Sequence, residues 1–157
     1  MRNPFVILLI GTPLSGKSTW IKNNYPHILT ISRDEIILQN SKFKDYDSAF
    51  EEVNQKEIDK ILEGKILEAS NNNESVIIDM TNLSSKRRAR NLGYFSHKYY
   101  KIGIVFPILE DKEYILRNAV RSKLEGKDIS LSIIKNMIKY YKSANLSEGF
   151  NKLIYPS

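Results

Sequence analysis

The stretch GTPLSGKST, residues 11–19, determines the fold that we expect for this chain. It matches G-x-x-x-x-G-K-[ST], the P-loop pattern, in which backbone N–H groups surround a phosphate. The apolar run FVILLI (Phe5–Ile10) precedes the pattern and predicts a buried strand, and Lys17–Asn23 predicts the first turns of a helix. A strand, a glycine-containing loop and a helix N-terminus together form an anion site, so we expect a nucleoside triphosphate with Mg²⁺ as ligand.

The positions of the loop have distinct predicted roles. Gly11 and Gly16 let the backbone turn and approach phosphates without a Cβ in the way. Lys17 can reach the β- and γ-phosphates, and the hydroxyl of Ser18 can ligate Mg²⁺. The alternative, a chance match in an ordinary turn, is disfavoured by the strand and helix on either side. The predicted nucleotide-binding residues are Gly11, Thr12, Pro13, Leu14, Ser15, Gly16, Lys17, Ser18 and Thr19.

Length and composition limit the remaining possibilities. The 157 residues predict one domain, 1–157, and contain 41% hydrophobic and 27% charged residues, as is ordinary for a globular chain. There is no cysteine, which excludes disulfides and thiolate zinc sites. The apolar run before the P-loop is too short for a signal peptide, and no segment reaches membrane-spanning length, so we expect a cytoplasmic protein.

The net charge of +6 suits a polyanionic partner such as nucleic acid, although many small basic proteins bind none. The two histidines, His27 and His97, are too few for a histidine-based metal site without carboxylates, and we expect both on the surface.

Strand-like and helix-like segments alternate along the chain. This alternation predicts an α/β fold, a parallel sheet flanked by helices, with the last helices forming a C-terminal lid. The further predicted strands are residues 28–31, 75–78 and 101–106, and the further predicted helices are residues 33–39, 48–70, 84–99, 111–124 and 132–141.

Asp34 follows the second predicted strand. Ligands of open α/β sheets bind beyond the carboxyl ends of the strands, so Asp34 is expected to face the phosphates held by Lys17. A carboxylate there can orient a hydroxyl and accept its proton during phosphoryl transfer. Asp is also a strong helix N-cap, and the spacing favours neither interpretation over the other.

Asp79 follows directly on the third predicted strand, SVII (residues 75–78), in a Walker-B-like element. It is a candidate ligand of Mg²⁺, together with Ser18. The alternative is an aspartate that only begins a turn.

Two groups of cations are candidate anion contacts. Arg117 and Arg121 lie four residues apart and therefore on one face of a predicted helix, where they could clamp phosphates; the alternative is a solvated face. A second group surrounds a predicted helix N-terminus, where positive charge is disfavoured. An anionic partner or a solvated face explains this second group equally well; its members are Lys86, Arg87, Arg88 and Arg90.

Taken together, GTPLSGKSTW, ISRDE, IIDMTNLSSKRRA and LRNAVRSK…ISLSIIKNMIKYY resemble, in order, the kinase domain of phage-type 5′-polynucleotide kinases. The resemblance covers nearly the whole chain and implies transfer of the γ-phosphate of ATP to a 5′-hydroxyl end of DNA or RNA, as in nucleic-acid repair. It makes Lys17 and Ser18 the P-loop residues, Asp34 the general base, and Arg117 and Arg121 the lid arginines. It also makes a phage-encoded origin an expectation.

The sequence departs from that family at three places. The phage pattern has an arginine where this chain has Ile37, and its acid before T-N-L stands at the position of Met80, one residue after Asp79. No D-x-D-x-T phosphatase motif is present. The departures bear on the acceptor more than on phosphoryl transfer. A small-molecule kinase acting on a nucleoside, metabolite or antibiotic hydroxyl is the alternative, and a regulatory nucleotide-binding module is a third; GTPase switching is disfavoured because N-K-x-D is missing.

Overall fold

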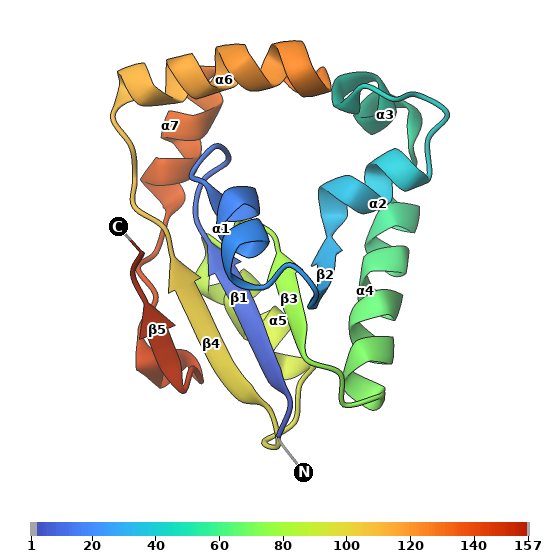
Figure 1. Cartoon of the computed structure of the whole chain (residues 1–157), viewed down its shortest axis with the longest axis vertical. Coiled ribbons are helices and arrows are strands. Elements are labelled where there is room, and N and C mark those ends of the chain that lie inside the picture. The colour runs from blue at the N-terminus through green and yellow to red at the C-terminus, as the bar shows by residue number, and fades with distance from the viewer. Residues whose placement is uncertain (1–2, 157) are drawn as a thin grey trace.

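A five-stranded sheet forms the centre of the molecule. The computed structural model describes residues 3–156, and its strands pair in the order β2-β3-β1-β4-β5, with every pair parallel. The fold is therefore the predicted α/β P-loop arrangement, with β1 in the middle of the sheet (Figure 1). The strands are β1 (Phe5–Ile10), β2 (Leu29–Ser32), β3 (Val76–Asp79), β4 (Tyr100–Val105) and β5 (Lys152–Ile154).

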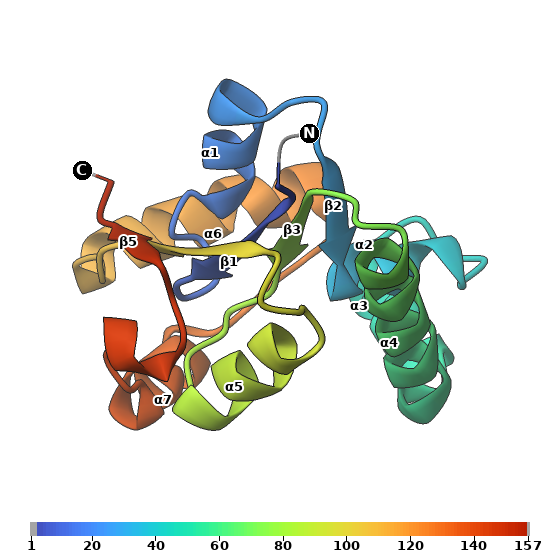
Figure 2. The ribbon, with the colours of Figure 1, turned by 90° about the horizontal axis from the view of Figure 1, so that it is seen from below.

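Strand β1 is an uninterrupted apolar run because both faces of the sheet are covered. Val6, Leu8 and Ile10 pack into one core cluster, whereas Ile7 and Leu9 pack into the other, as the alternation of side chains along a strand requires. Helix α1 covers the face that carries Ile7, and α5 lies against the opposite face (Figure 2). The P-loop that follows β1 is thus anchored to the most buried strand.

Helices flank the sheet and extend beyond its carboxyl end. Helix α6 crosses above the ends of the strands and reaches α3 on the far side (Figure 1). We call α6, the following loop and α7, residues 111–140, the lid. The helices are α1 (Lys17–Asn24), α2 (Arg33–Gln39), α3 (Tyr46–Glu52), α4 (Gln55–Asn71), α5 (Ser85–Gly93), α6 (Asp111–Glu125) and α7 (Leu131–Tyr140), with one 3₁₀ turn, η1 (Leu146–Glu148).

The prediction of one long helix over residues 48–70 is wrong. Val53 is extended (φ −74°, ψ 153°), and the chain divides there into α3 and α4. The side chain of Asn54 accepts hydrogen bonds from the backbone N–H groups of Lys56 and Glu57 at 3.0 and 3.2 Å, so it caps α4. Apolar spacing continued through the break and hid this N-cap signal.

The helix predicted over residues 84–99 is also too long, because α5 ends at Gly93. The segment after it turns instead and buries two aromatic rings, Phe95 and Tyr99, whose centroids lie 4.8 Å apart. Strand β5 was not predicted, since three residues carry too little pattern.

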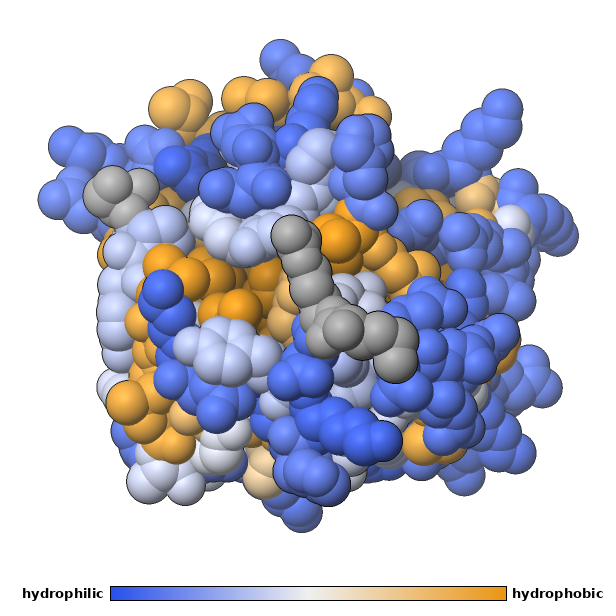
Figure 3. Space-filling model, turned by 60° about the horizontal axis from the view of Figure 1, so that its bottom comes forward, coloured by the Kyte–Doolittle hydropathy of each residue, from blue (hydrophilic) through white to orange (hydrophobic). Residues whose placement is uncertain are grey.

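The two ends of the sheet differ in character. Hydrophilic side chains cover most of the end near the N-terminus, with a smaller apolar area beside it (Figure 3). The carboxyl end carries the P-loop and the polar residues after β2 and β3, as expected for a parallel sheet. Within residues 3–156, no helix is long and apolar enough to span a bilayer.

Candidate active site

The P-loop leaves β1 in a strained, glycine-dependent conformation. Gly16 has φ +98°, a left-handed value that a side chain would disfavour, and Leu14 adopts φ +70°. A Cβ on Gly11 would lie 2.7 Å from Ser15 Oγ, so this position has no room for a side chain. The N–H of Gly11 donates to the carbonyl of Thr81 at 3.0 Å, which ties the loop to the segment after β3.

Lys17 points back into this loop. Its Nζ donates to the carbonyl oxygens of Gly11 and Thr12, both at 2.8 Å. Burial lowers the pKa of the Lys17 ammonium to about 8, while Asp79 opposes that shift. A buried cation held only by carbonyls is ready to exchange them for an anionic ligand.

A cavity of about 720 Å³ opens between the P-loop and α6. Lys17, Ser18 and Thr19 line one side, and Arg117 and Arg121 line the other. The predicted shared face of the two arginines is thus present, and it faces the P-loop. Arg117 is already engaged, because its Nη1 donates to the carbonyl of Leu14 at 2.8 Å and its Nε to Glu113 at 2.8 Å.

Arg121 differs from Arg117 in having no partner for part of its guanidinium. Its Nε and Nη2 are buried and have no hydrogen-bond acceptor among residues 3–156. Burial also lowers the pKa of Arg121, with carboxylates such as Glu125 opposing. Buried donors without acceptors are costly, and Arg121 also lines the cavity, so a turn of its guanidinium toward a phosphate there would remove that cost.

Asp34 is not a helix cap. Ser32 caps α2, accepting from the N–H of Glu35 at 3.3 Å, so the capping alternative for Asp34 is wrong. The carboxylate of Asp34 accepts instead from the hydroxyl of Tyr46 at 2.7 Å and from Nζ of Lys127. Burial opposes its ionisation, but Lys127 and Tyr46 outweigh that effect and hold the pKa of Asp34 below its usual value.

Asp79 lies on the P-loop side of the sheet. It shares the strand face of Ile77, which packs in the cluster beneath α1, whereas Met80 packs against the opposite cluster. Burial raises the pKa of Asp79, and the nearby Lys17 opposes this. The one-residue shift relative to the phage pattern therefore puts the acid, and not the methionine, on the face of the sheet that α1 covers.

The arrangement fits a nucleoside triphosphate with Mg²⁺. The left-handed loop at Gly16, the buried ammonium of Lys17 and the unsatisfied donors of Arg121 are what a polyphosphate would complete. The exposed hydroxyl of Ser18 and the half-buried carboxylate of Asp79 offer the oxygen ligands that Mg²⁺ prefers. Residues 3–156 contain no cluster of three histidines or acids, so phosphate and water oxygens would supply the other ligands.

Sequence reasoning missed Lys127 and Tyr46. Lys127 lies between the predicted helices 111–124 and 132–141, and its Nζ lies 4.2 Å from the centroid of the Tyr46 ring and also contacts Asp34. Neither residue belongs to a motif. The one signal in the sequence is the position of Lys127, a basic residue two positions after the end of α6.

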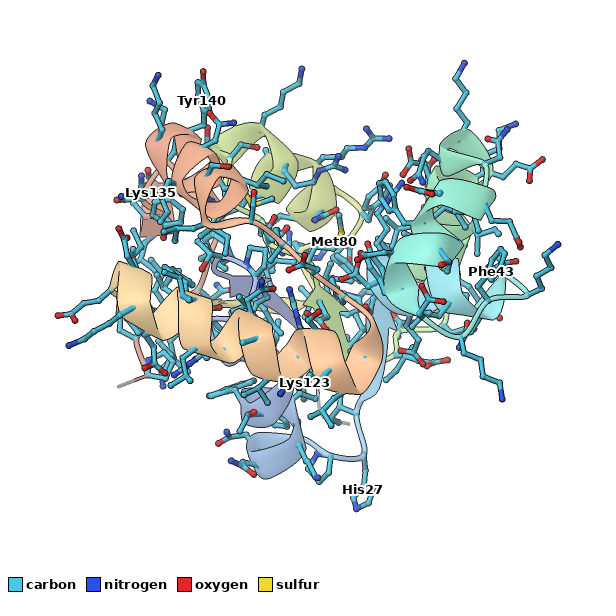
Figure 4. All side chains as sticks on the ribbon, turned by 90° about the horizontal axis from the view of Figure 1, so that it is seen from above. His27, Phe43, Met80, Lys123, Lys135 and Tyr140 are labelled. Atoms are coloured by element: carbon cyan, nitrogen blue, oxygen red, sulfur yellow. The ribbon has the colours of Figure 1, made fainter. Side chains whose placement is uncertain are left out.

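One cation of the second group has an internal role. Arg88 is fully buried and pairs with Glu148 at 2.8 Å, so its interpretation as a contact for an anionic partner is wrong. It also donates to the carbonyl of Asn82, the Asn of T-N-L, at 3.0 Å. Lys86, Arg87 and Arg90 are exposed. His27 and His97 are exposed, as expected, and His27 lies at the outer edge in Figure 4.

The chain belongs to a known family. A family model described as an AAA domain matches residues 6–144, which is most of the chain. The motif-bearing segments, from β1 through the lid, all fall inside the matched region.

Three solved structures share the fold. One chain of the Pnkp1/Rnl/Hen1 RNA repair complex is 24% identical with a TM-score of 0.70, covering 89% of this chain but only 44% of that one. Kti12 of Chaetomium thermophilum, solved with ADP-AlF₃, is 14% identical (TM-score 0.69; 97% and 88% covered). A gluconokinase of Sinorhizobium meliloti 1021 is 12% identical (TM-score 0.57; 99% and 83% covered). At these identities the likeness establishes the P-loop kinase-like fold alone.

Proposed function

We propose that this protein is a phosphotransferase that moves the γ-phosphate of ATP to a 5′-hydroxyl end of DNA or RNA. The observation that carries the proposal is Arg121, which lines the P-loop cavity and whose Nε and Nη2 are buried with no hydrogen-bond partner among residues 3–156. It matches what a transferring phosphoryl group requires, namely positive charge that is already in place before the reaction.

On the donor side, the P-loop amides, Lys17 and Arg121 would hold the polyphosphate. Lys17 would exchange the carbonyls of Gly11 and Thr12 for phosphate oxygens. Ser18 and Asp79 would hold Mg²⁺, which when bound neutralises charge on the β- and γ-phosphates. Arg117 would keep the lid against the loop through Leu14.

On the acceptor side, Asp34 would act as general base. It would accept the proton of the acceptor hydroxyl while the hydroxyl oxygen bonds to the γ-phosphorus and the bond from phosphorus to the β–γ bridging oxygen breaks. ADP leaves with that bridging oxygen, and the proton rests on the Asp34 carboxylate. Lys127 and Tyr46 hold the pKa of Asp34 below its usual value, so the carboxylate is ionised.

A nucleic-acid acceptor is supported by three features. The ordered motifs resemble 5′-polynucleotide kinases, the net charge is +6, and one structure with the same fold comes from an RNA repair complex. Because this chain spans less than half of that RNA repair chain, the likeness bears on the fold of one part of it.

A panel of acceptors tests the proposal. Protein, γ-labelled ATP and Mg²⁺ are incubated with 5′-hydroxyl DNA and RNA oligonucleotides, a nucleoside and gluconate. We expect label on an oligonucleotide and a rate that falls steeply with salt, because polynucleotide binding releases counterions. Label on a small neutral acceptor alone, without salt dependence, would contradict the proposal.

A small-molecule acceptor is the second candidate, and one residue favours it. Ile37 occupies the position at which the phage pattern has an arginine, and it is fully buried in the core. Nothing at that position can contact a phosphate of the acceptor strand. The gluconokinase with the same fold shows that this architecture serves a sugar-acid kinase.

A further inference from the structure

The loop after α6 is docked onto the N-terminus of α3. The carbonyl of Gly126 accepts from the N–H of Asp47 at 3.2 Å, and the N–H of Asp128 donates to the Asp47 carboxylate at 3.1 Å. Between them, Lys127 reaches Asp34 and lies 4.2 Å from the ring centroid of Tyr46. Three consecutive residues of the lid therefore contact the acceptor side of the site.

The backbone at this contact is specific. Gly126 has φ +62°, and a Cβ on it would lie 2.5 Å from Cβ of Asp45 and 3.3 Å from Cα of Asp45. The close approach thus depends on glycine both for its conformation and for space. Asn118 of α6 supports the loop from the lid side, donating to Asp128 at 2.7 Å and accepting from the N–H of Ile129 at 3.0 Å.

The other end of α6 is attached differently. The hydroxyl of Tyr114 is hydrogen-bonded to Thr12 at 2.8 Å and accepts from the N–H of Leu109 at 3.1 Å, and the side chain is buried. That end moves with the P-loop, whereas the end at Gly126 is held by polar groups that water can replace. The lid can therefore separate from α3 while it stays attached at Tyr114.

We propose that residues 126–128 form a latch that holds the lid closed over the phosphate cavity, with Lys127 seated on the carboxylate that the acceptor hydroxyl needs. Both oxygens of Asp34 are engaged when the latch is closed, one by Tyr46 and the other by Lys127. Opening of the lid and exposure of the base are then the same event. The latch is an autoinhibitory contact built from three residues. That it blocks a general base rests on the proposed function, whereas the closure of the lid against α3 does not.

The distance between the lid and α3 tests the latch directly. Because the chain has no cysteine, Leu124→Cys on α6 and Glu51→Cys on α3 give two unique sites for spin labels. Leu124 is 79% exposed and Glu51 is exposed, so the labels should not disturb the core. The labelled protein is measured without nucleotide or acceptor.

We expect one narrow, short distance distribution for the parent protein. Lys127→Met should shift it to longer and broader distances, and Gly126→Ala should do the same through the contact with Asp45. Lys127→Arg, which keeps the charge, should restore the short distance. Lys123→Met is the matched control, since it removes an exposed lysine of α6, four residues before Lys127 (Figure 4), and should change nothing.

An unchanged distribution in both Lys127→Met and Gly126→Ala would overturn the latch. An equal shift of the distance in Lys123→Met would also overturn the latch, because loss of any positive charge from this part of the lid would then explain the longer distance. Melting temperatures of all variants identify any that fail to fold. The measurement uses no substrate, so a chain that phosphorylates no oligonucleotide would disprove the proposed function and leave this result standing.

Discussion

The donor side and the acceptor side of the site are built in different ways. The centre of the proposed donor side is one continuous segment, residues 11–19, in which backbone N–H groups and Lys17 meet at a helix N-terminus. The acceptor side is assembled from three separate places: Asp34 on α2, Tyr46 on α3 and Lys127 in the lid. A phosphate-binding loop is therefore specified by one short segment of sequence, whereas the surroundings of the proposed base, Asp34, depend on the whole fold.

If the two sides are separable, a change at Asp34 should abolish transfer without weakening nucleotide binding. We expect Asp34→Asn to lower the rate of phosphoryl transfer by about 10⁴-fold, because the amide accepts no proton. ADP affinity, measured by calorimetry, should stay nearly unchanged. A large loss of ADP affinity would show that Asp34 belongs to the donor side as well.

The converse change on the donor side should affect both measurements. Lys17→Met removes the ammonium that lies on Gly11 and Thr12, and we expect transfer to fall by about 10³-fold together with a marked loss of ADP affinity. Transfer rates and calorimetry on the same preparation check this. Normal ADP affinity in Lys17→Met would contradict the assignment of Lys17 to phosphate binding.

We expect Arg121 to support activity at a cost to the stability of the protein. Arg121→Met removes buried donors that have no partner, so transfer should fall by about 10²-fold. The free energy of unfolding should rise by about 1 kcal/mol, which corresponds to an increase of about 2–4 °C in Tm for a chain of this size. Arg117→Met is the matched control: it loses the contact to Leu14, so its Tm should fall. A lower Tm in Arg121→Met would mean that Arg121 has a structural partner.

The pH dependence of nucleotide binding sharpens the comparison further. The pKa of Lys17 is about 8 in the ligand-free protein, and bound phosphate would keep the ammonium charged. Above pH 8 the binding of ADP must then be accompanied by protonation of Lys17, so ADP affinity should fall about tenfold per pH unit. Below pH 8 Lys17 is already charged, and ADP affinity should not depend on its titration. Calorimetry in excess EDTA measures this without metal. Lys17→Arg, which stays charged, should show no such fall, and an equal fall would assign the dependence to another group.

The sequence predicted the structure around the P-loop well because the information is local there. The P-loop, its strand and the opening of α1 follow from the residues 5–19 and their periodicity, and the shared face of Arg117 and Arg121 follows from their spacing. The parallel sheet followed from the alternation of strands and helices.

Most of the failures have one physical cause, which is tertiary contact. The division between α3 and α4 is the exception, because it depends on the local cap at Asn54, which the continuing apolar spacing hid. The early end of α5 depends on the burial of Phe95 and Tyr99. Arg88 looked like a surface cation until the fold placed Glu148, sixty residues away in sequence, beside it. Lys127 and Asp34 are 93 residues apart, and no spacing rule connects them.

The most direct test of the central claim is the end specificity of the transfer. An oligonucleotide with a 5′-hydroxyl and the same oligonucleotide with a 5′-phosphate are incubated separately with the protein, γ-labelled ATP and Mg²⁺. The account predicts label on the 5′-hydroxyl strand alone, removable by a phosphatase. No label on either strand, with ADP still bound by the protein, would contradict it and point to a small-molecule hydroxyl as the acceptor.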